Sequence, residues 1–248
     1  MTTRSRATTG IVFLALAAGS GRGFAETVQL APSKDTTLYE DDFGITSDGQ
    51  GQYFFAGRTN GGLIRRGLIA FDIVCNIPAG ATIVGVTLTL HVSRAPAGSP
   101  EIEVDLHAAR TDWGEGASKA IGQEGSGAPA EPGDATWLHT FYDTQFWTST
   151  GGDFSPVITS SAAVTGIGFY TFDSMFDPGL VSDAQRWLDQ PDTNFGWVVT
   201  VGDEYFPRSA KRFDSRENGT PELQPVLTVT YSTAGADLIS PDPLPLSP

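Results

Sequence analysis

The chain has 248 residues, of which 29 are acidic and 15 are lysine or arginine, so its formal net charge at pH 7 is −14. This charge argues against nucleic acid as a partner, because proteins bind nucleic acid chiefly through Lys and Arg that neutralise phosphates. The single cysteine, Cys75, excludes an intrachain disulfide, and its place at the end of an apolar segment predicts a buried free thiol.

Residues 1–25 are predicted to be a secretory signal peptide. Arg4 and Arg6 precede an apolar run from Ile11 to Ala18, and small residues lead to Ala25, which is the order of a signal peptide. The run is shorter than the roughly 20 residues of a membrane span, and a short buried helix is the alternative. We expect export to the extracellular space or periplasm after cleavage near Ala25. The mature chain would have no integral membrane segment and a charge of −17, because cleavage removes three arginines and no acid.

Residues 26–232 are predicted to form one all-β domain. Apolar residues alternate with polar ones in "ATIVGVTLTLHVSR" and "EIEVDLHAAR", which predicts half-buried strands. Residues 111–136 are rich in Gly, Pro, Ser and acids and predict a long loop. One helix is expected in "DPGLVSDAQRWLDQP", capped by Asp177 and ended by Pro191. This pattern favours an antiparallel β-sandwich or jelly roll with one short amphipathic helix, followed by a disordered Pro-rich tail at 233–248.

Catalytic signatures are not found in the sequence. His91, His107 and His139 each lie in an alternating segment, which favours hydrogen-bonded strand histidines over a zinc site. Glu115 and Glu217 could act as a glycosidase-like pair if they lay ~5–10 Å apart. Nothing in the sequence brings those two residues together, so we expect no catalytic residue.

The segment "YEDDFGITSDGQGQ" suggests a metal site. It places Asp41, Asp42 and Asp48 in a Gly-rich turn, and Ca²⁺ takes six to eight oxygen ligands. The spacing differs from that of an EF-hand, and solvated loop acids are the alternative. Ca²⁺ is therefore a candidate cofactor at these three residues.

Four aromatic residues lie in or beside the long middle loop: Trp113, Trp137, Tyr142 and Trp147. Exposed rings of this kind give apolar platforms for sugar rings, while nearby carboxylates such as Glu115 orient hydroxyl groups. The alternative is that the rings cap the open end of the sandwich. We expect the loop to fold back so that the rings line one shallow glycan-binding groove.

The stretch "AKRFDSREN" concentrates charge in a chain that is only 18% charged. In a strand, Arg212, Asp214 and Arg216 share one face and Glu217 lies on the other. An arginine that forms a forked pair with a carboxylate can hold a strand in register. We predict a structural latch in which Arg216 pairs with an acid of a neighbouring strand, Asp72 being the candidate, with a ligand-contacting site as the alternative.

Several segments together resemble the DNRLRE-domain family of secreted bacterial proteins: "FFAGRTNGG", "RRGLIAFDI", "IPAGATIVGVTLTLHV", "DWGEG", "GDATWLH", "WLDQPDTNFGW" and "RFDSREN…PVLTVTY". The resemblance implies a jelly roll related to carbohydrate-binding modules, some of which bind acidic polysaccharides such as alginate. The mature charge opposes a polyanion. We therefore expect a non-catalytic domain that recognises a neutral or calcium-bridged polysaccharide. A cell-surface structural or adhesion protein without glycan binding is the main alternative, and a polysaccharide-cleaving enzyme is the third.

Overall fold

The computed structural model describes residues 25–98 and 101–233, so the predicted signal peptide before Ala25 and the tail from 234 lie outside it. The described part is mostly β, and its one α-helix is α1 (Gly179–Asp189). The strands are β1 (Ala25–Leu30), β2 (Lys34–Tyr39), β3 (Thr46–Ser47), β4 (Tyr53–Arg58), β5 (Ile64–Ala70), β6 (Thr82–Arg94), β7 (Ile102–Ala108), β8 (Ala128–Pro129), β9 (His139–Phe141), β10 (Gln145–Phe146), β11 (Ser160–Val164), β12 (Gly168–Asp173), β13 (Trp197–Val201), β14 (Lys211–Asp214) and β15 (Val226–Ser232). Two 3₁₀ turns span Pro191–Thr193 and Pro221–Leu223.

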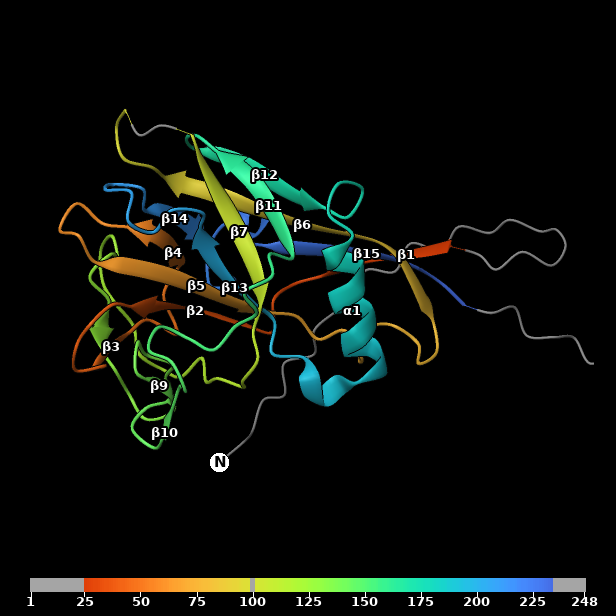
Figure 1. Cartoon of the computed structure of the whole chain (residues 1–248), viewed down its shortest axis with the longest axis horizontal. Coiled ribbons are helices and arrows are strands. Elements are labelled where there is room, and N and C mark those ends of the chain that lie inside the picture. Colours follow the sequence, from red (N-terminus) through yellow and green to blue (C-terminus); the bar gives the residue numbers. More distant parts are fainter. Residues whose placement is uncertain (1–24, 99–100, 234–248) are drawn as a thin grey trace, which may run out of the picture.

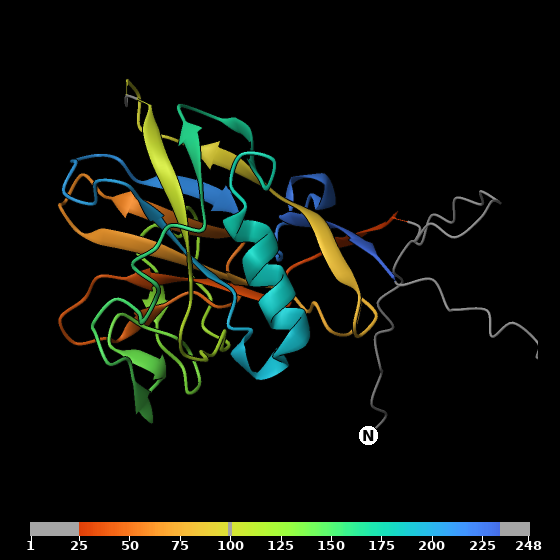
Figure 2. The ribbon, with the colours of Figure 1, turned by 45° about the vertical axis from the view of Figure 1, so that its right-hand side comes forward.

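One large antiparallel sheet dominates the fold, as the sequence predicts. Its strand order is β1-β15-β6-β14-β4-β5-β13-β7-β11, with β12 paired to β6 and β2 paired to β5. Strand β4 joins two halves of this sheet, one that runs from β1 to β14 and one that runs from β5 to β11. Ala56 of β4 pairs with β14, whereas Gly57 pairs with β5. Gly57 has φ +109, and a Cβ there would lie 2.9 Å from the backbone of Ala210, so only glycine fits this corner. The sheet curls into a sandwich-like domain (Figures 1 and 2).

The main core lies inside this curl. Alternate residues of β6 contribute Val86, Leu88, Leu90 and Val92, and the facing half of the sheet contributes residues such as Leu106 and Trp197. The period-2 pattern of the sequence thus corresponds to the buried face of each strand.

Helix α1 packs against β6 and joins the same core (Figure 2). Its buried side chains include Leu180, Ala184, Trp187 and Leu188, which are on the predicted apolar face. The predicted cap is wrong. Pro178 occupies the N-cap position, and Asp177 accepts hydrogen bonds from the hydroxyl and backbone N–H groups of two neighbouring serines, Ser160 and Ser161.

A second core covers the outer face of the β2-β5-β13 half. Leu38, Leu68 and Val198 from these strands pack with Trp113 of the long loop and with Trp137 and Trp147, which follow it. The loop therefore shields apolar sheet surface that would otherwise face water. Among the described helices, none is long and apolar enough to cross a membrane.

Candidate functional site

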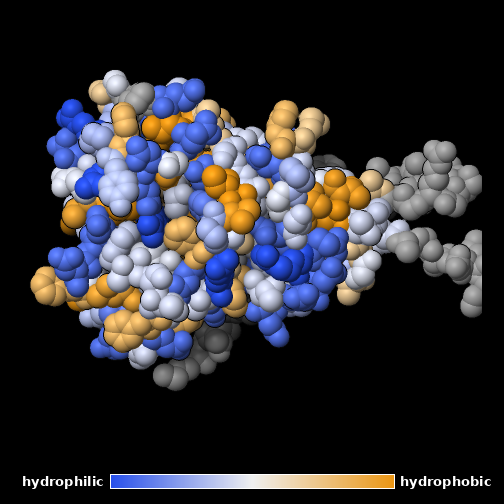
Figure 3. Space-filling model, viewed as in Figure 1, coloured by the Kyte–Doolittle hydropathy of each residue, from blue (hydrophilic) through white to orange (hydrophobic). Residues whose placement is uncertain are grey.

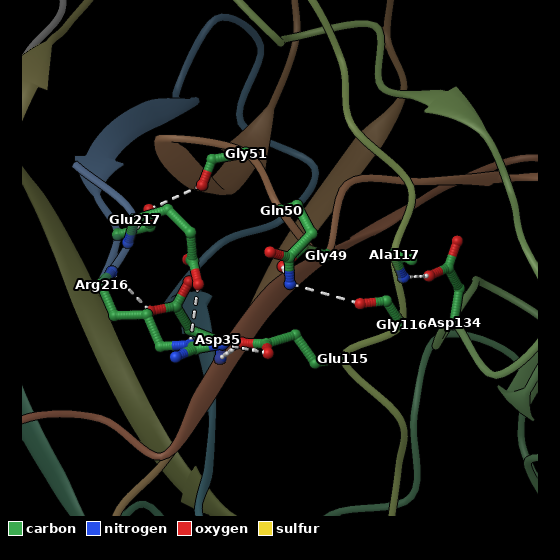
Figure 4. A network of polar contacts seen from close by, with 11 residues as sticks. Asp35, Gly49, Gln50, Gly51, Glu115, Gly116, Ala117, Asp134, Arg216 and Glu217 are labelled. Atoms are coloured by element: carbon green, nitrogen blue, oxygen red, sulfur yellow. Dashed lines mark hydrogen bonds and ion pairs between the residues drawn. The ribbon is translucent and has the colours of Figure 1, made fainter. Parts of the chain in front are cut away.

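Four charged side chains from three distant segments meet beside β2 and form what we call the Arg216 cluster (Figure 4). Asp35 belongs to β2, Glu115 to the long loop, and Arg216 and Glu217 follow β14 directly. Arg216 Nε lies 2.7 Å from Glu115 Oε1, and its Nη2 bonds to Oε2 of the same carboxylate. Arg216 Nε also lies 2.9 Å from Glu217 Oε1. The backbone N–H of Arg216 donates to Asp35 at 2.8 Å, so the cluster ties together all three segments.

The loop that carries Glu115 is fixed by close packing. Gln50 donates through its side-chain amide to the carbonyl of Gly116 at 3.3 Å (Figure 4). A Cβ added to Gly49 would lie 1.7 Å from the carbonyl oxygen of Glu115. Only glycine at position 49 therefore lets the two loops approach closely enough for Glu115 to reach Arg216.

The Arg216 cluster holds three carboxyl groups against one guanidinium. Burial raises the pKa of Glu217 to about 7, and the neighbouring Glu115 carboxylate adds to this rise. Burial likewise raises the pKa of Asp35 well above its usual range, helped by the charge of Glu217. Oxygen Oε2 of Glu217 is buried without a hydrogen-bond partner. One positive charge cannot balance three closely spaced carboxylates, so Asp35 and Glu217 bind protons at higher pH than free carboxyl groups do.

The predicted partner of Arg216 was wrong. Asp72 is exposed and accepts a hydrogen bond from the backbone N–H of Cys75 in the turn after β5. Cys75 is also exposed, because this turn projects from the sheet, and the prediction of a buried thiol is wrong too.

The other charges of the "AKRFDSREN" segment have different partners. Asp214 lies 2.5 Å from the ring of His91 and accepts a bond from Asn218 at 2.7 Å. The guanidinium of Arg212 lies 3.7 Å from the ring centroid of Tyr53. The dense charge run therefore serves several contacts, and only Arg216 and Glu217 belong to the Arg216 cluster.

Metal-ligating geometry does not arise at the predicted loop. Asp41 accepts hydrogen bonds from the N–H groups of Phe43 and Ile45, whereas Asp42 is exposed. Asp48 is buried and accepts from the N–H of Ala120 at 2.7 Å. The three acids do not converge, so the prediction of a calcium site at Asp41, Asp42 and Asp48 is wrong. In the described part of the chain, the acids that converge are Asp35, Glu115 and Glu217, with oxygens within 4.8 Å of one another. These oxygens could ligate a cation, but Arg216 supplies the positive charge there.

The tryptophans do not line an exposed groove. Trp113, Trp137 and Trp147 are buried in the second core, and the indole N–H of Trp113 donates to the carbonyl of Phe195 at 2.9 Å. Tyr142 is half-buried. The predicted platform is wrong, because the outer face of the sheet needs an apolar cover and the tryptophans supply it. The alternative foresaw that the rings cover apolar surface, but it placed them at the open end of the sandwich and not on the outer face of β2, β5 and β13.

The histidines are hydrogen-bonded at three separate places, which confirms the interpretation as structural strand residues. His91 pairs with Asp214, His107 Nδ1 lies 2.9 Å from the carbonyl oxygen of Ser155, and His139 Nδ1 lies 2.9 Å from the hydroxyl of Thr136.

A pocket of about 560 Å³ opens at the end of β2 and is called the Phe43 pocket. It is lined by Tyr39, Glu40, Asp41, Asp42, Phe43, Ile45, Thr46, Leu63, Arg65 and Ser126. The Phe43 side chain is 76% exposed, and Ile45 and Leu63 are also exposed. Apolar surface is visible in Figure 3 on the lower left, where the turn between β2 and β3 lies in Figure 1. The pocket combines an open aromatic ring with several carboxylates.

The turn between β2 and β3 gives the Phe43 pocket its shape. Burial tends to raise the pKa of Asp41. Hydrogen bonds from the N–H groups of Phe43 and Ile45 and from the hydroxyl of Thr46 have the larger combined effect, so the pKa of Asp41 is lowered. Asp41 therefore stays ionised and holds the turn that projects the ring of Phe43. Arg65 is buried, with its guanidinium 4.8 Å from the ring centroid of Tyr39.

A second pocket of about 580 Å³ adjoins the long loop. Its lining is Arg66, Arg110, Thr111, Thr148, Ser149, Thr150, Gly152, Asp153 and Phe154. Its aromatic ring, Phe154, is half-buried, and Asp153 accepts hydrogen bonds from the N–H groups of Thr148 and Ser149. This pocket offers less open ring surface than the Phe43 pocket.

Sequence reasoning missed Phe43 as a functional candidate. The signal was present, because Phe43 follows three consecutive acids, Glu40, Asp41 and Asp42, in a predicted turn. A large apolar residue in an acidic turn has no strand neighbours to cover it, and it becomes a candidate ligand contact where other exposed apolar residues adjoin it, as Ile45 and Leu63 do in the pocket.

No protein-family model matches the chain, and no curated protein matches it. The class of protein is therefore defined by its fold and pocket: a mostly β domain with one large curled antiparallel sheet, a single α-helix in the described residues and an acid-lined, partly apolar pocket. The likeness to the DNRLRE-domain family stays a prediction from the sequence.

Proposed function

We propose that this protein is an exported, non-catalytic carbohydrate-binding protein and that the Phe43 pocket holds a sugar of a polysaccharide. The observation that carries the proposal is the exposed ring of Phe43 on a pocket with three carboxylates. A sugar ring presents apolar C–H faces and polar hydroxyl groups. An exposed aromatic ring provides contact area for the former, and carboxylates accept hydrogen bonds from the latter.

The pocket has the size and composition that ligand sites favour. Its volume falls within the range of about 300–1,000 Å³ that is typical for small-ligand sites. The exposed apolar side chains of Phe43, Ile45 and Leu63 form its rim. Contact through ring faces requires few charges, so binding of a neutral sugar should depend only weakly on salt.

Polysaccharide cleavage is a second candidate function because of one observation. Glu115 and Glu217 lie close together, and the pKa of Glu217 is raised by burial to about 7, as in the acid of a glycosidase pair. However, Arg216 bonds to both carboxylates, and neither residue lines the Phe43 pocket. We therefore favour binding without catalysis. Release of reducing ends from a polysaccharide, lost in Glu217→Gln, would reverse this preference.

Affinity electrophoresis against a panel of soluble polysaccharides tests the proposal. We expect wild type to be retarded by at least one glycan and Phe43→Ala to migrate freely. Phe176→Ala is the matched control, because Phe176 is 79% exposed and lies in the turn between β12 and α1. Equal retardation of wild type and Phe43→Ala would contradict the site. No retardation by any glycan, with the fold intact, would favour the surface structural or adhesion alternative.

A further inference from the structure

The charges of the Phe43 pocket select among glycans. We propose that its ligand is a polysaccharide with free primary amines, such as a polymer that contains glucosamine without N-acetyl groups. This inference rests on the proposed function and adds the substrate class. It follows from the number of carboxylates in the pocket, from what each of them contacts and from the apolar rim beside them.

The pocket has an excess of negative charge. Its lining contains Glu40, Asp41 and Asp42 against one cation, Arg65. Arg65 is buried, and its guanidinium donates to the backbone carbonyls of Ile64 and Gly125. The one positive group of the lining therefore donates to backbone carbonyls, and its charge offsets part of that of Glu40 and Asp41. The pocket still keeps an excess of negative charge, with Asp42 exposed to an incoming ligand.

The three carboxylates differ in their availability. The carboxylate oxygens of Asp41 accept hydrogen bonds from the N–H groups of Phe43 and Ile45. Glu40 accepts from the N–H of Ile64 at 2.5 Å. Asp42 is exposed and makes no hydrogen bond or ion pair with any residue in the described ranges. Asp42 is thus the acceptor with free capacity, and the other two add negative potential around it.

An ammonium group matches these acceptors better than a hydroxyl or an acetamide. It offers three donors and no acceptor, whereas the pocket offers carboxylates that only accept when ionised. Charge-assisted hydrogen bonds are roughly twice as strong as neutral ones. The chain's formal charge of −14 also favours the approach of a cationic polymer.

The apolar rim favours a sugar over a basic peptide. Phe43 presents an exposed ring beside the carboxylates, and Ile45 and Leu63 extend this apolar surface. A glucosamine unit carries an amine directly on a ring with apolar C–H faces, so one unit can contact both features at once. A lysine carries its amine at the end of a flexible chain, and it would lose more conformational freedom on binding.

Calorimetry with hexamers of glucosamine and of N-acetylglucosamine tests the inference on the full mature chain. The titrations use low salt and a pH at which the amines are protonated. We expect the glucosamine hexamer to bind wild type at least about tenfold more tightly, a difference of about 1.4 kcal/mol. Asp42→Asn should bring the ratio of the two affinities close to one, and added salt should weaken only the amine-containing hexamer. Phe176→Ala should behave as wild type.

Each contrary result has a separate meaning. If both hexamers bind equally and Phe43→Ala abolishes both, the amine preference is wrong while the glycan site stands. If neither hexamer binds but a neutral polysaccharide is bound through Phe43, the inference also fails and the proposed function survives. Poly-lysine that binds as tightly as the glucosamine hexamer, and loses affinity equally in Asp42→Asn, would replace the sugar with a basic peptide. If no glycan binds at all, both proposals fall.

Discussion

Carboxylates gather at two places in this protein, and their surroundings differ. In the Arg216 cluster, Glu115 and Glu217 share one guanidinium, and Asp35 accepts a hydrogen bond from the backbone N–H of Arg216. In the Phe43 pocket the cation is engaged with backbone carbonyls and Asp42 is exposed. Acid content alone therefore does not locate a binding site in this protein. What separates the two places is whether an exposed carboxylate is left without a partner in the described part of the fold, as Asp42 is in the Phe43 pocket.

The tryptophans of the long loop give the largest expected effect. Trp113→Ala should lower the free energy of unfolding by about 3–5 kcal/mol, because it removes a fully buried side chain from the second core. Urea unfolding measures this change. A cost below about 1 kcal/mol would mean that the ring lies on the surface, as a glycan platform requires, and it would move the binding site back to the loop.

Breaking the Arg216 cluster should be nearly as costly. We expect Arg216→Ala to lose about 3 kcal/mol, the lower end of the range for a broken buried pair, because the Arg216 side chain is still 31% exposed. Arg110→Ala is the control, since Arg110 is exposed and forms no ion pair with the described residues. Equal urea midpoints for Arg216→Ala and the control would show that the cluster does not hold the fold together.

The protons of the Arg216 cluster predict a pH dependence. The folded-state pKa of Glu217, about 7, exceeds its ordinary value of 4.5, so between these values the folded state binds more protons than the unfolded state. The contribution of Glu217 to stability therefore falls as pH rises from about 4.5 to 7, by at most about 1.4 kcal/mol per pH unit.

Glu217→Gln isolates this contribution from those of the other acids. Unfolding free energies measured from pH 4.5 to 8 should decline less steeply in the variant than in wild type. A steeper decline in the variant, or parallel curves, would contradict the raised pKa.

The Phe43 pocket should show the smallest effect on stability. Phe43→Ala is expected to change the free energy of unfolding by less than about 0.5 kcal/mol, because the side chain is 76% exposed. A thermal melt compares the variant with wild type and Phe176→Ala. A loss above about 2 kcal/mol would assign Phe43 a structural role and would remove the separation between the two regions.

The fold was easier to predict from the sequence than the site residues were. The alternation in β6 and the apolar face of α1 are local patterns, and a period of two or of 3.6 residues reports burial directly. Which acid meets Arg216 depends on contacts across 101 and 181 residues of chain, to Glu115 and Asp35. No local pattern encodes such pairings, which explains why Asp72 was a reasonable but wrong choice.

The burial of the tryptophans could not be predicted from local sequence patterns either. A loop rich in Gly, Pro and acids is predicted to be exposed, yet Trp113 within it and Trp137 and Trp147 beside it cover the outer face of β2, β5 and β13. Strand β13 is buried at all five positions, and a strand apolar on both faces requires a cover on each side. The sequence "WVVTV" indicates that β13 needs a cover on both faces. Which segment provides that cover depends on the path of the chain in space.

Hydrogen exchange with and without a bound polysaccharide tests the glycan site most directly. The measurement uses a glycan that retards wild type in affinity electrophoresis and follows amide exchange along residues 26–248. We predict slower exchange in the bound state at residues 39–46, 63–65 and 126, which line the Phe43 pocket, with no change at 111–122 and 137–154. Slower exchange confined to 111–122 and 137–154 would contradict the account and return the binding site to the tryptophan-bearing segments.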